Sequence, residues 1–286
     1  MLYSTTSLGN IAIKPQGKNT KDAIKQPILS EKNIIPRLLT SCIIVGRSGS
    51  GKSVLTSALL NGKTMLGDAF DLVVLISPTA STDDVQMSFP VTSEECVVDD
   101  LKKAPEFLDG LMGVQKKKIQ EFGADQAPLV CVIFDDCAGD TKFLNCKEFT
   151  ACFTRSRHYN FTVFCLTQQY KNIPKRCRLQ CNNLMFFKSP DTESEAVCDD
   201  HTPPNYSKNK FMELIHWATH EKHSFLYINM KEPFETRYRR NFSEIINLQC
   251  ESKRTKRKRS TKQEDTSLKE NNVSENDTEK EGEGFR

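Results

Sequence analysis

One stretch, LLTSCIIVGRSGSGKSVLTSALL at residues 38–60, constrains the fold of this 286-residue chain more than any other. An apolar run rich in Ile and Val leads into GRSGSGKS at residues 46–53, and helix-forming residues follow. The spacing G-x4-G-K-S between a buried strand and a helix is the pattern of a phosphate-binding loop. The stretch therefore predicts an α/β fold in which residues 38–45 form a strand and residues 53–60 a helix.

Phosphate binding explains these residue types. Glycines let the backbone curl so that its N–H groups face the phosphates, and the new helix presents its positive end to the same anion. Lys52 would reach the β- and γ-phosphates, and the Ser53 hydroxyl would hold Mg²⁺. We therefore expect ATP and Mg²⁺ as cofactors. The predicted nucleotide contacts are Gly46, Arg47, Ser48, Gly49, Ser50, Gly51, Lys52, Ser53 and Val54.

Short apolar runs alternate with helical patterns along the rest of the chain. Strands apolar on both faces are typical of a mostly parallel sheet that is covered by helices on both sides. The further predicted strands are residues 71–77, 129–134, 161–166, 184–187 and 225–229, and the further predicted helices lie within 92–122, 142–155 and 210–220.

The run 129–134 ends in two carboxylates, Asp135 and Asp136. A buried strand that ends in this way suits a bound metal: Asp135 would anchor Mg²⁺ through water, and Asp136 would orient and deprotonate the attacking water. The alternative interpretation makes Asp136 only the N-cap of a helix.

The run 161–166 is followed by Thr167, Gln168 and Gln169. In one large division of NTPases, the RecA-like or ASCE type, a strand with a polar sensor lies between the Walker A strand and the Walker B strand. Gln168 would then sense the γ-phosphate, and no guanine-reading Asn-Lys-x-Asp is present. The alternative makes Gln168 a polar group satisfied by backbone at the strand end.

A basic turn, TRSRHYN at residues 154–160, precedes that strand. Arg155 or Arg157, near a subunit edge, could reach the γ-phosphate of a neighbouring subunit, where transition-state charge develops. Arg47 in the phosphate loop is a rival that would act within its own subunit. The turn could also be an ordinary solvated one, and we expect Arg178 to contact DNA or another subunit.

These four pieces, GRSGSGKS, VIFDD, TRSRHYN and FCLTQQYKNIPKRCR, together resemble the vaccinia-type genome-packaging ATPases of the FtsK–HerA superfamily. Such proteins occur in large DNA viruses, virophages and Maverick/Polinton or adintovirus-like elements, and the resemblance covers roughly residues 38–230. In that family a glycine is common where this chain has Ser156. The resemblance implies an ATPase that moves double-stranded DNA into a preformed capsid as a homo-oligomeric ring, pentamer or hexamer, at capsid vertex or portal proteins.

On this resemblance Lys52 and Ser53 hold phosphate and Mg²⁺, Asp135 anchors the metal, Asp136 is the base and Gln168 the sensor, with Arg155 or Arg157 as the finger. A helicase or DNA-segregation ATPase of the same superfamily would share all of these residues. A slow NTP-dependent switch has less need of a base and a finger, and a passive DNA-binding protein leaves the phosphate loop unexplained.

The ends of the chain differ in composition from its middle. We expect a flexible arm over residues 1–30, an ATPase domain over 31–250 and a disordered tail over 251–286. The tail begins with a basic cluster, KRTKRKR at 253–259, within a net charge of +3. The cluster predicts nuclear import, with a DNA contact or a solubilising tail as alternatives.

No run of about 18 apolar residues and no secretory pattern is present, so we expect neither a membrane association nor secretion. The expected location is the host cell nucleus, or a virus factory, and the virion. Eleven cysteines are scattered through the chain, which favours buried reduced thiols. A zinc site is the alternative for four residues, Cys177, Cys181, Cys198 and His201.

Overall fold

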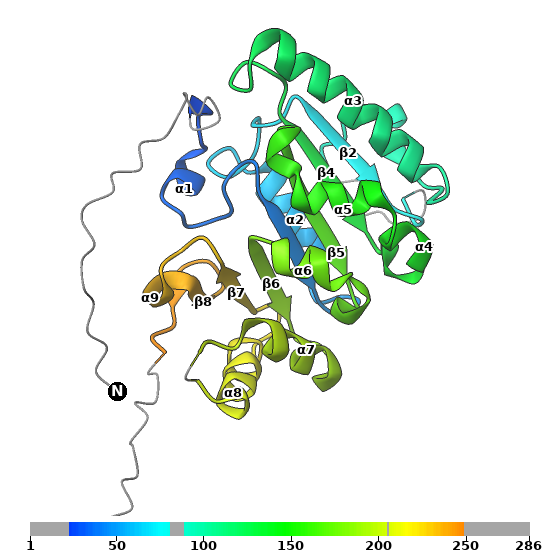
Figure 1. Ribbon diagram of the computed structural model, residues 1–286. Coiled ribbons are helices and arrows are strands. Elements are labelled where there is room, and N and C mark those ends of the chain that lie inside the picture. The colour runs from blue at the N-terminus through cyan, green and yellow to red at the C-terminus, as the bar shows by residue number, and fades with distance from the viewer. Residues whose placement is uncertain (1–22, 81–88, 205, 249–286) are drawn as a thin grey trace, which may run out of the picture. The chain divides into compact units, whose positions relative to one another are not determined.

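A computed structural model describes residues 23–80, 89–204 and 206–248. The centre of this part of the chain is a nine-stranded sheet with the order β3-β2-β4-β5-β1-β6-β7-β8-β9 (Figure 1). The strands are β1 (Ser41–Val45), β2 (Leu72–Ile76), β3 (Val97–Val98), β4 (Val130–Asp135), β5 (Phe161–Thr167), β6 (Asn183–Phe187), β7 (Phe225–Asn229), β8 (Tyr238–Arg240) and β9 (Glu244–Ile245).

Helices cover both faces of the sheet. In Figure 1, α3, α5 and α6 lie on one face and α2 lies behind the strands on the other. The α-helices are α1 (Ile28–Glu31), α2 (Lys52–Asn61), α3 (Ala104–Phe122), α4 (Thr141–Leu144), α5 (Lys147–Thr154), α6 (Lys175–Gln180), α7 (Asp191–His201), α8 (Lys208–Ala218) and α9 (Phe234–Arg237). The 3₁₀ turns are η3 (Glu94–Cys96), η4 (Cys137–Gly139), η5 (Ser156–His158) and η6 (Tyr170–Asn172).

The alternation of side chains along the central strands creates two apolar layers. In β1, Ile43 belongs to the layer that contains Phe149 of α5, whereas Ile44 belongs to the layer that contains Leu59 of α2. Because both faces of the strand are buried, its sequence is a continuous apolar run rather than an alternating one. The predicted sheet, covered on both sides, is confirmed.

Strand pairing places β5 between β1 and β4. Strands β2, β4, β5, β1 and β6 are parallel to their neighbours in that row, and β3 is parallel to β2. Strands β7, β8 and β9 extend the sheet by antiparallel pairing. The sheet is therefore mostly parallel, and the predicted strand between the loop strand and the acidic strand is present.

Most predicted bounds lie within two residues of the observed ones, but the helical range 92–122 also contains the strand β3, and two further elements differ more. The helix predicted over residues 142–155 is broken into α4 and α5, because the Asp140 carboxylate accepts from Phe143 N at 2.9 Å and Cys146 Sγ accepts from Phe149 N at 3.3 Å, so each segment has its own cap. The strand predicted from residue 38 begins at Ser41, since Leu39 has φ +57°, which a strand cannot accommodate.

The packed part of the chain begins earlier than the predicted boundary at residue 31. Ile24 is buried in the apolar layer of α2, and the side-chain oxygen of Gln26 accepts from Leu38 N at 2.8 Å. Residues 1–22 and the predicted tail, including the basic cluster 253–259, lie outside the described residues. The flexible arm and the disordered tail stay predictions.

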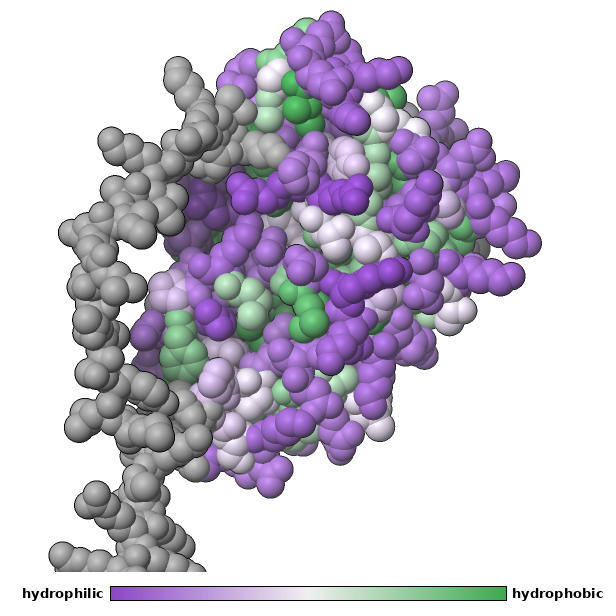
Figure 2. All heavy atoms as spheres, in the orientation of Figure 1, coloured by the Kyte–Doolittle hydropathy of each residue, from purple (hydrophilic) through white to green (hydrophobic). Residues whose placement is uncertain are grey.

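No described helix has the length and apolarity needed to cross a membrane. On the face that Figure 2 shows, hydrophilic side chains predominate and apolar ones occur in small groups.

The turn that leads into β5 depends on Asn160. This residue is buried and has φ +53°, a conformation that asparagine tolerates better than most residues. Its Nδ2 donates to Ala124 O at 2.7 Å and to Ala127 O at 3.3 Å, which ties the turn to the segment after α3.

Asn160→Gly should lower the free energy of unfolding by about 1–3 kcal/mol, because it leaves these carbonyls without their donor while it keeps the backbone conformation. Asn160→Ala should cost about 1 kcal/mol more, since alanine also strains the left-handed backbone. Chemical denaturation measures both, and wild-type stability in the glycine variant would show that the side-chain hydrogen bonds contribute nothing.

Candidate nucleotide-binding site

The carboxyl ends of three neighbouring parallel strands bring the predicted site together. Val45, at the end of β1, pairs with Thr167 of β5, and Asp135, at the end of β4, pairs with Leu166 of β5. The residues that follow these strand ends therefore meet at one edge of the sheet. They are the phosphate loop, Asp136 and Gln168.

The phosphate loop has the backbone that its glycines were expected to permit. Gly49 and Gly51 have φ of +72° and +107°, and α2 starts directly after Gly51. A side chain at position 46 would clash with its neighbours, because a Cβ there would lie 2.4 Å from Ser50 Oγ and 2.8 Å from the Phe187 Cβ. The first turn of α2 carries Ser53 and the exposed Val54.

The Lys52 ammonium contacts the first two residues of this loop. Its Nζ donates to the carbonyl oxygens of Gly46 at 2.9 Å and Arg47 at 3.1 Å. Burial lowers the pKa of Lys52, and the carboxylates of Asp135 and Asp136 oppose that shift. The lysine predicted from the loop and the carboxylates predicted from β4 therefore share one electrostatic environment.

The two carboxylates of β4 differ in exposure. Asp135 is buried with 4% of its surface exposed, whereas Asp136 is exposed and has φ +52°. Asp136 occupies the N-cap position of η4, yet its side chain accepts no capping hydrogen bond. The N-cap alternative therefore does not account for the Asp136 carboxylate, which is left available to solvent and to a substrate.

A cation would find oxygen ligands at this edge. The Asp135 carboxylate and the Ser53 hydroxyl are the hard donors that Mg²⁺ prefers, and Mg²⁺ usually takes one or two carboxylates together with phosphate oxygens and water. The residue types fit that metal. Within the described residues, no three His, Cys, Asp or Glu side chains gather as an all-protein metal site.

Gln168 directly follows the end of β5, at the same edge of the sheet. The Thr167 hydroxyl oxygen accepts from Gln169 N at 3.0 Å, so the strand ends in a tight turn. Gln168 is exposed, and its side chain makes no hydrogen bond within the described part of the chain. The alternative that local backbone satisfies this amide is therefore wrong.

The arginines of the basic turn lie at the other edge of the sheet. Arg155 and Arg157 precede β5, whereas the phosphate loop adjoins its carboxyl end. The seven residues of β5 span about 20 Å at the usual rise of a strand. Neither arginine can therefore reach the phosphate loop of its own chain, while Arg47 lies exposed within that loop. Ser156 has no positive φ, so the turn does not require a glycine there.

A buried polar network supports the segment that follows Gln168. The Tyr170 hydroxyl donates to Asp200 Oδ2 at 3.1 Å and lies 3.0 Å from His201 Nε2. Arg178 Nε lies 2.8 Å from the same Asp200 oxygen, and the guanidinium packs 4.8 Å from the centre of the Tyr170 ring. Because tyrosine has one proton, which goes to Asp200, neutral His201 must donate from Nε2.

This network corrects the expectation for Arg178. Its side chain is only 12% exposed, and Nη1 also donates to Lys171 O at 3.2 Å. Arg178 therefore links α6 to the sensor segment and to α7 within one chain, rather than reaching DNA or another subunit. The Lys171 N–H donates to the Glu193 carboxylate at 3.0 Å, a second link between this segment and α7.

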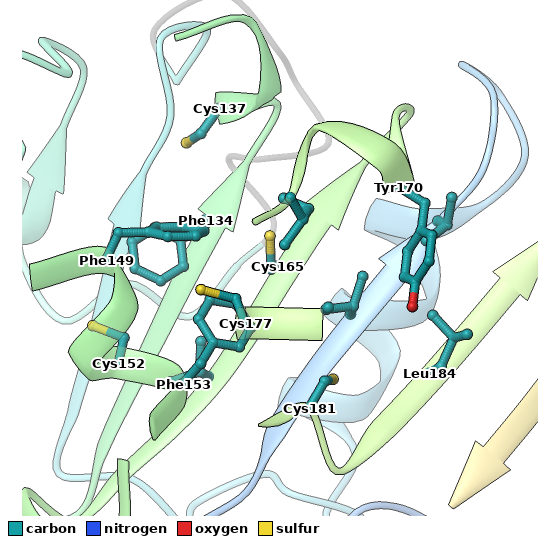
Figure 3. Packing of buried hydrophobic residues seen from close by; sticks show 14 of the residues in the cluster. Phe134, Cys137, Phe149, Cys152, Phe153, Cys165, Tyr170, Cys177, Cys181 and Leu184 are labelled. Atoms are coloured by element: carbon teal, nitrogen blue, oxygen red, sulfur yellow. The ribbon is translucent and has the colours of Figure 1, made fainter. Parts of the chain in front are cut away.

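The cysteines are structural. The described ones are free, and all except Cys146 are buried. In Figure 3, Cys152 and Cys177 lie in the apolar cluster that holds Phe149 and Phe153. Cys181 and Cys198 belong to the same cluster, where Cys181 Sγ lies 3.4 Å from Ser41 O, and His201 belongs to the Tyr170 network. The zinc alternative fails, because no three His, Cys, Asp or Glu side chains of the described residues lie close enough together to hold a metal ion.

Sequence reasoning missed the network of Tyr170, Asp200 and His201. It also missed the contact of His223, whose Nδ1 lies 3.0 Å from the carbonyl oxygen of Ser50 in the phosphate loop. The local pattern gave no signal for these contacts. The sequence separation is 30 and 31 residues for the tyrosine contacts and 173 residues for the histidine contact.

A strand that ends in an acidic pair, a strand that leads into the phosphate loop, and between them a strand followed by the polar Gln168 place the chain among P-loop NTPase folds of the RecA-like type. Within that class, the chain belongs to the family of the poxvirus A32 protein, whose model matches residues 35–234.

The chain is similar to the uncharacterized protein 015R of Frog virus 3 (isolate Goorha), with 28% identity over 172 residues. The match covers 59% of this chain and 48% of that protein, so the chain spans about half the length of this relative. Among solved structures it is similar to B204, the DNA-packaging ATPase from Sulfolobus turreted icosahedral virus, with 15% identity, a TM-score of 0.47, and coverage of 68% of this chain and 93% of that one.

It is also similar to the genome packaging NTPase B204 of Sulfolobus turreted icosahedral virus 2 in complex with ATP-gammaS. The identity there is 16%, the TM-score is 0.47, and the match covers 67% of this chain and 92% of that one.

His201 should make stability depend on pH. Burial, as the main cause, lowers the pKa of His201 from 6.5 to about 4; the nearby Arg178 acts in the same direction and Asp200 in the opposite one. At pH values between these two pKa values, His201 binds a proton in the unfolded chain but not in the folded one. Stability that is present at pH 7 is therefore lost as the pH falls.

From pH 7 to pH 5 the wild-type free energy of unfolding should fall by about 2 kcal/mol more than that of His201→Gln, which lacks the titrating imidazole. Denaturant titrations at both pH values measure this difference. Parallel pH dependence in the two proteins would contradict it.

Proposed function

We propose that the chain hydrolyses ATP and uses the energy to move double-stranded viral DNA into a preformed capsid. The observation that carries the proposal is the meeting of Lys52, Asp136 and Gln168 at one sheet edge, in a chain of the poxvirus A32 protein family. The DNA-packaging ATPase named among the similar structures is consistent with this activity.

Each residue has a role that follows from its position. Lys52 and the N–H groups of the loop bind the β- and γ-phosphates, while Ser53 and Asp135 hold Mg²⁺. Mg²⁺, when bound, neutralises charge that develops on the phosphate oxygens. Asp136, exposed and without a capping hydrogen bond, orients the attacking water and accepts its proton.

Gln168 reports the γ-phosphate to the rest of the chain. Its segment continues directly into Tyr170, whose hydroxyl contacts Asp200 and His201 on α7. A displacement of Gln168 on hydrolysis would therefore be transmitted to α7 through a buried and charged contact. DNA and capsid proteins are the proposed recipients of that motion, and residues 253–259 are the proposed signal for nuclear import.

The proposed activity is tested by the ATPase rate with and without double-stranded DNA, on protein whose oligomeric state is measured by light scattering. We expect a ring whose rate rises with DNA. Asp136→Asn, a matched variant of nearly equal shape, should still bind ATP but turn over about 10²–10⁴-fold more slowly, because the general base is lost.

A monomer whose slow turnover is indifferent to DNA would instead indicate a nucleotide-dependent switch. Wild-type turnover in Asp136→Asn would remove Asp136 from the chemistry.

In the proposed ring, Arg155 or Arg157 serves the site of a neighbour, because both lie at the sheet edge opposite the phosphate loop of their own chain. Arg157→Ala subunits and Asp136→Asn subunits should each be inactive alone, since loss of an arginine finger costs about 10³–10⁵-fold in rate. Mixed in one ring, the Asp136→Asn subunit would supply Arg157 to the intact acidic site of its neighbour.

The mixture should therefore recover ATPase activity that neither protein has alone. The same mixture made with Arg155→Ala identifies which arginine acts. If neither arginine variant loses activity while Arg47→Ala does, the finger acts within the subunit.

A further inference from the structure

A cavity of about 340 Å³ borders the phosphate loop on the side away from the acidic strand. One wall is the loop itself, residues 47–50. The opposite wall is the segment between α8 and β7, residues 220–224, and the end of β6 supplies Phe187 and Lys188. Its size falls within the usual range of about 300–1,000 Å³ for small-molecule sites.

The sheet order fixes which part of a nucleotide this cavity can receive. The γ-phosphate must face Asp136 and Gln168, which follow β4 and β5 on one side of β1. Strands β6 and β7 lie on the other side of β1, and the start of antiparallel β7 shares the edge at which the phosphate loop lies. A triphosphate held along the loop with its γ-phosphate towards β4 therefore directs its nucleoside end to the cavity.

The residues that line the cavity suit a nucleobase that is attached to negatively charged phosphates. Two imidazoles, His220 and His223, offer flat rings, and aromatic side chains stack on nucleobases. Three cations, Arg47, Lys188 and Lys222, also line the cavity and would face the phosphates nearest the ribose. The only carboxylate in the lining, Glu221, is engaged by Arg240 at 2.7 Å.

The segment 220–224 is held against the phosphate loop by specific contacts. His223 Nδ1 lies 3.0 Å from Ser50 O, and since a carbonyl only accepts, the proton is on Nδ1. His223 has φ +64°, and Ser224 Oγ donates to Glu221 O at 2.8 Å. At the start of β7, Phe225 N donates to the Asn241 side chain. The wall of the cavity is thus formed before a ligand arrives, and it touches the loop through one hydrogen bond.

We propose that this cavity is the nucleoside subsite: it receives the base and ribose of the nucleoside triphosphate, with His220 against the base, while His223 positions the phosphate loop. The assignment rests on the proposed nucleotide binding and adds the part of the ligand that the phosphate loop does not contact. His220 contacts the ligand directly, and His223 acts through Ser50.

Calorimetric titration of the full chain with a non-hydrolysable ATP analogue and, separately, with inorganic tripolyphosphate tests the subsite. His220→Ala should bind the analogue about tenfold more weakly, because base stacking is lost, and should bind tripolyphosphate as the wild type does. His216→Ala is the matched control: this imidazole of the same region contacts Asp191 and lies outside the cavity lining, so neither ligand should be affected.

Lys52→Ala should lose both ligands, since both use the phosphate loop. If the wild type binds neither ligand, the proposed function fails as well; if it binds both and His220→Ala binds the analogue normally, only the subsite is overturned. Equal weakening of both ligands in His220→Ala would also overturn it, because that residue would then act on the loop.

His223→Leu removes the donor to Ser50 O and should weaken tripolyphosphate binding, whereas His223→Asn presents a side-chain N–H in the place of Nδ1–H and should restore it. Equal losses in the two variants would contradict the positioning role. Circular dichroism melts of each variant ensure that folded proteins are compared.

Discussion

The parallel pairing of β5 with β1 on one side and β4 on the other is the constraint on which the site depends. The ladders run from Ser41 to Val45 against β1 and from Val130 to Asp135 against β4. Because parallel strands all end at one edge, the phosphate loop, Asp136 and Gln168 meet there. The pairing continues to the loops themselves, since Gly46 N donates to Thr167 O at 3.1 Å and Asp136 N donates to Leu166 O at 3.2 Å. A slip in either ladder would move one group relative to the other two.

Most of the central sheet could be predicted because the information is local. Strands such as β4 are buried on both faces and appear as continuous apolar runs. The elements that were missed lack such runs: β9 has two exposed residues, and α7 has the mainly polar sequence DTESEAVCDDH. The break between α4 and α5 depends on a cysteine cap, which residue preferences do not predict.

The same contrast holds for the site. The loop, the acidic pair and Gln168 are short motifs next to predicted strands, so their convergence follows from parallel pairing. The residues that support them come from distant positions: Arg178 and Asp200 form a buried ion pair, and His223 reaches the loop through Ser50. A lone arginine or histidine in a sequence carries no sign of such a partner, because the fold, rather than the spacing, creates the contact. Buried charges of this kind need good partners, which makes the network a rigid support for the sensor segment.

The positions of the phosphate loop and the basic turn at opposite edges of the sheet favour assembly of several copies of the chain. A subunit of this fold carries the phosphate loop at one edge and the basic turn with Arg155 and Arg157 at the other, about 20 Å away along β5. An interface that joins one edge to the opposite edge of the next copy is heterologous, and such an interface closes into a ring when its rotation permits. In the proposed ring every nucleotide would lie between the phosphate loop of one subunit and an arginine of the neighbouring subunit. Hydrolysis would then require the neighbour, which couples each subunit's chemistry to the position of the next and prevents an isolated subunit from consuming ATP without moving DNA.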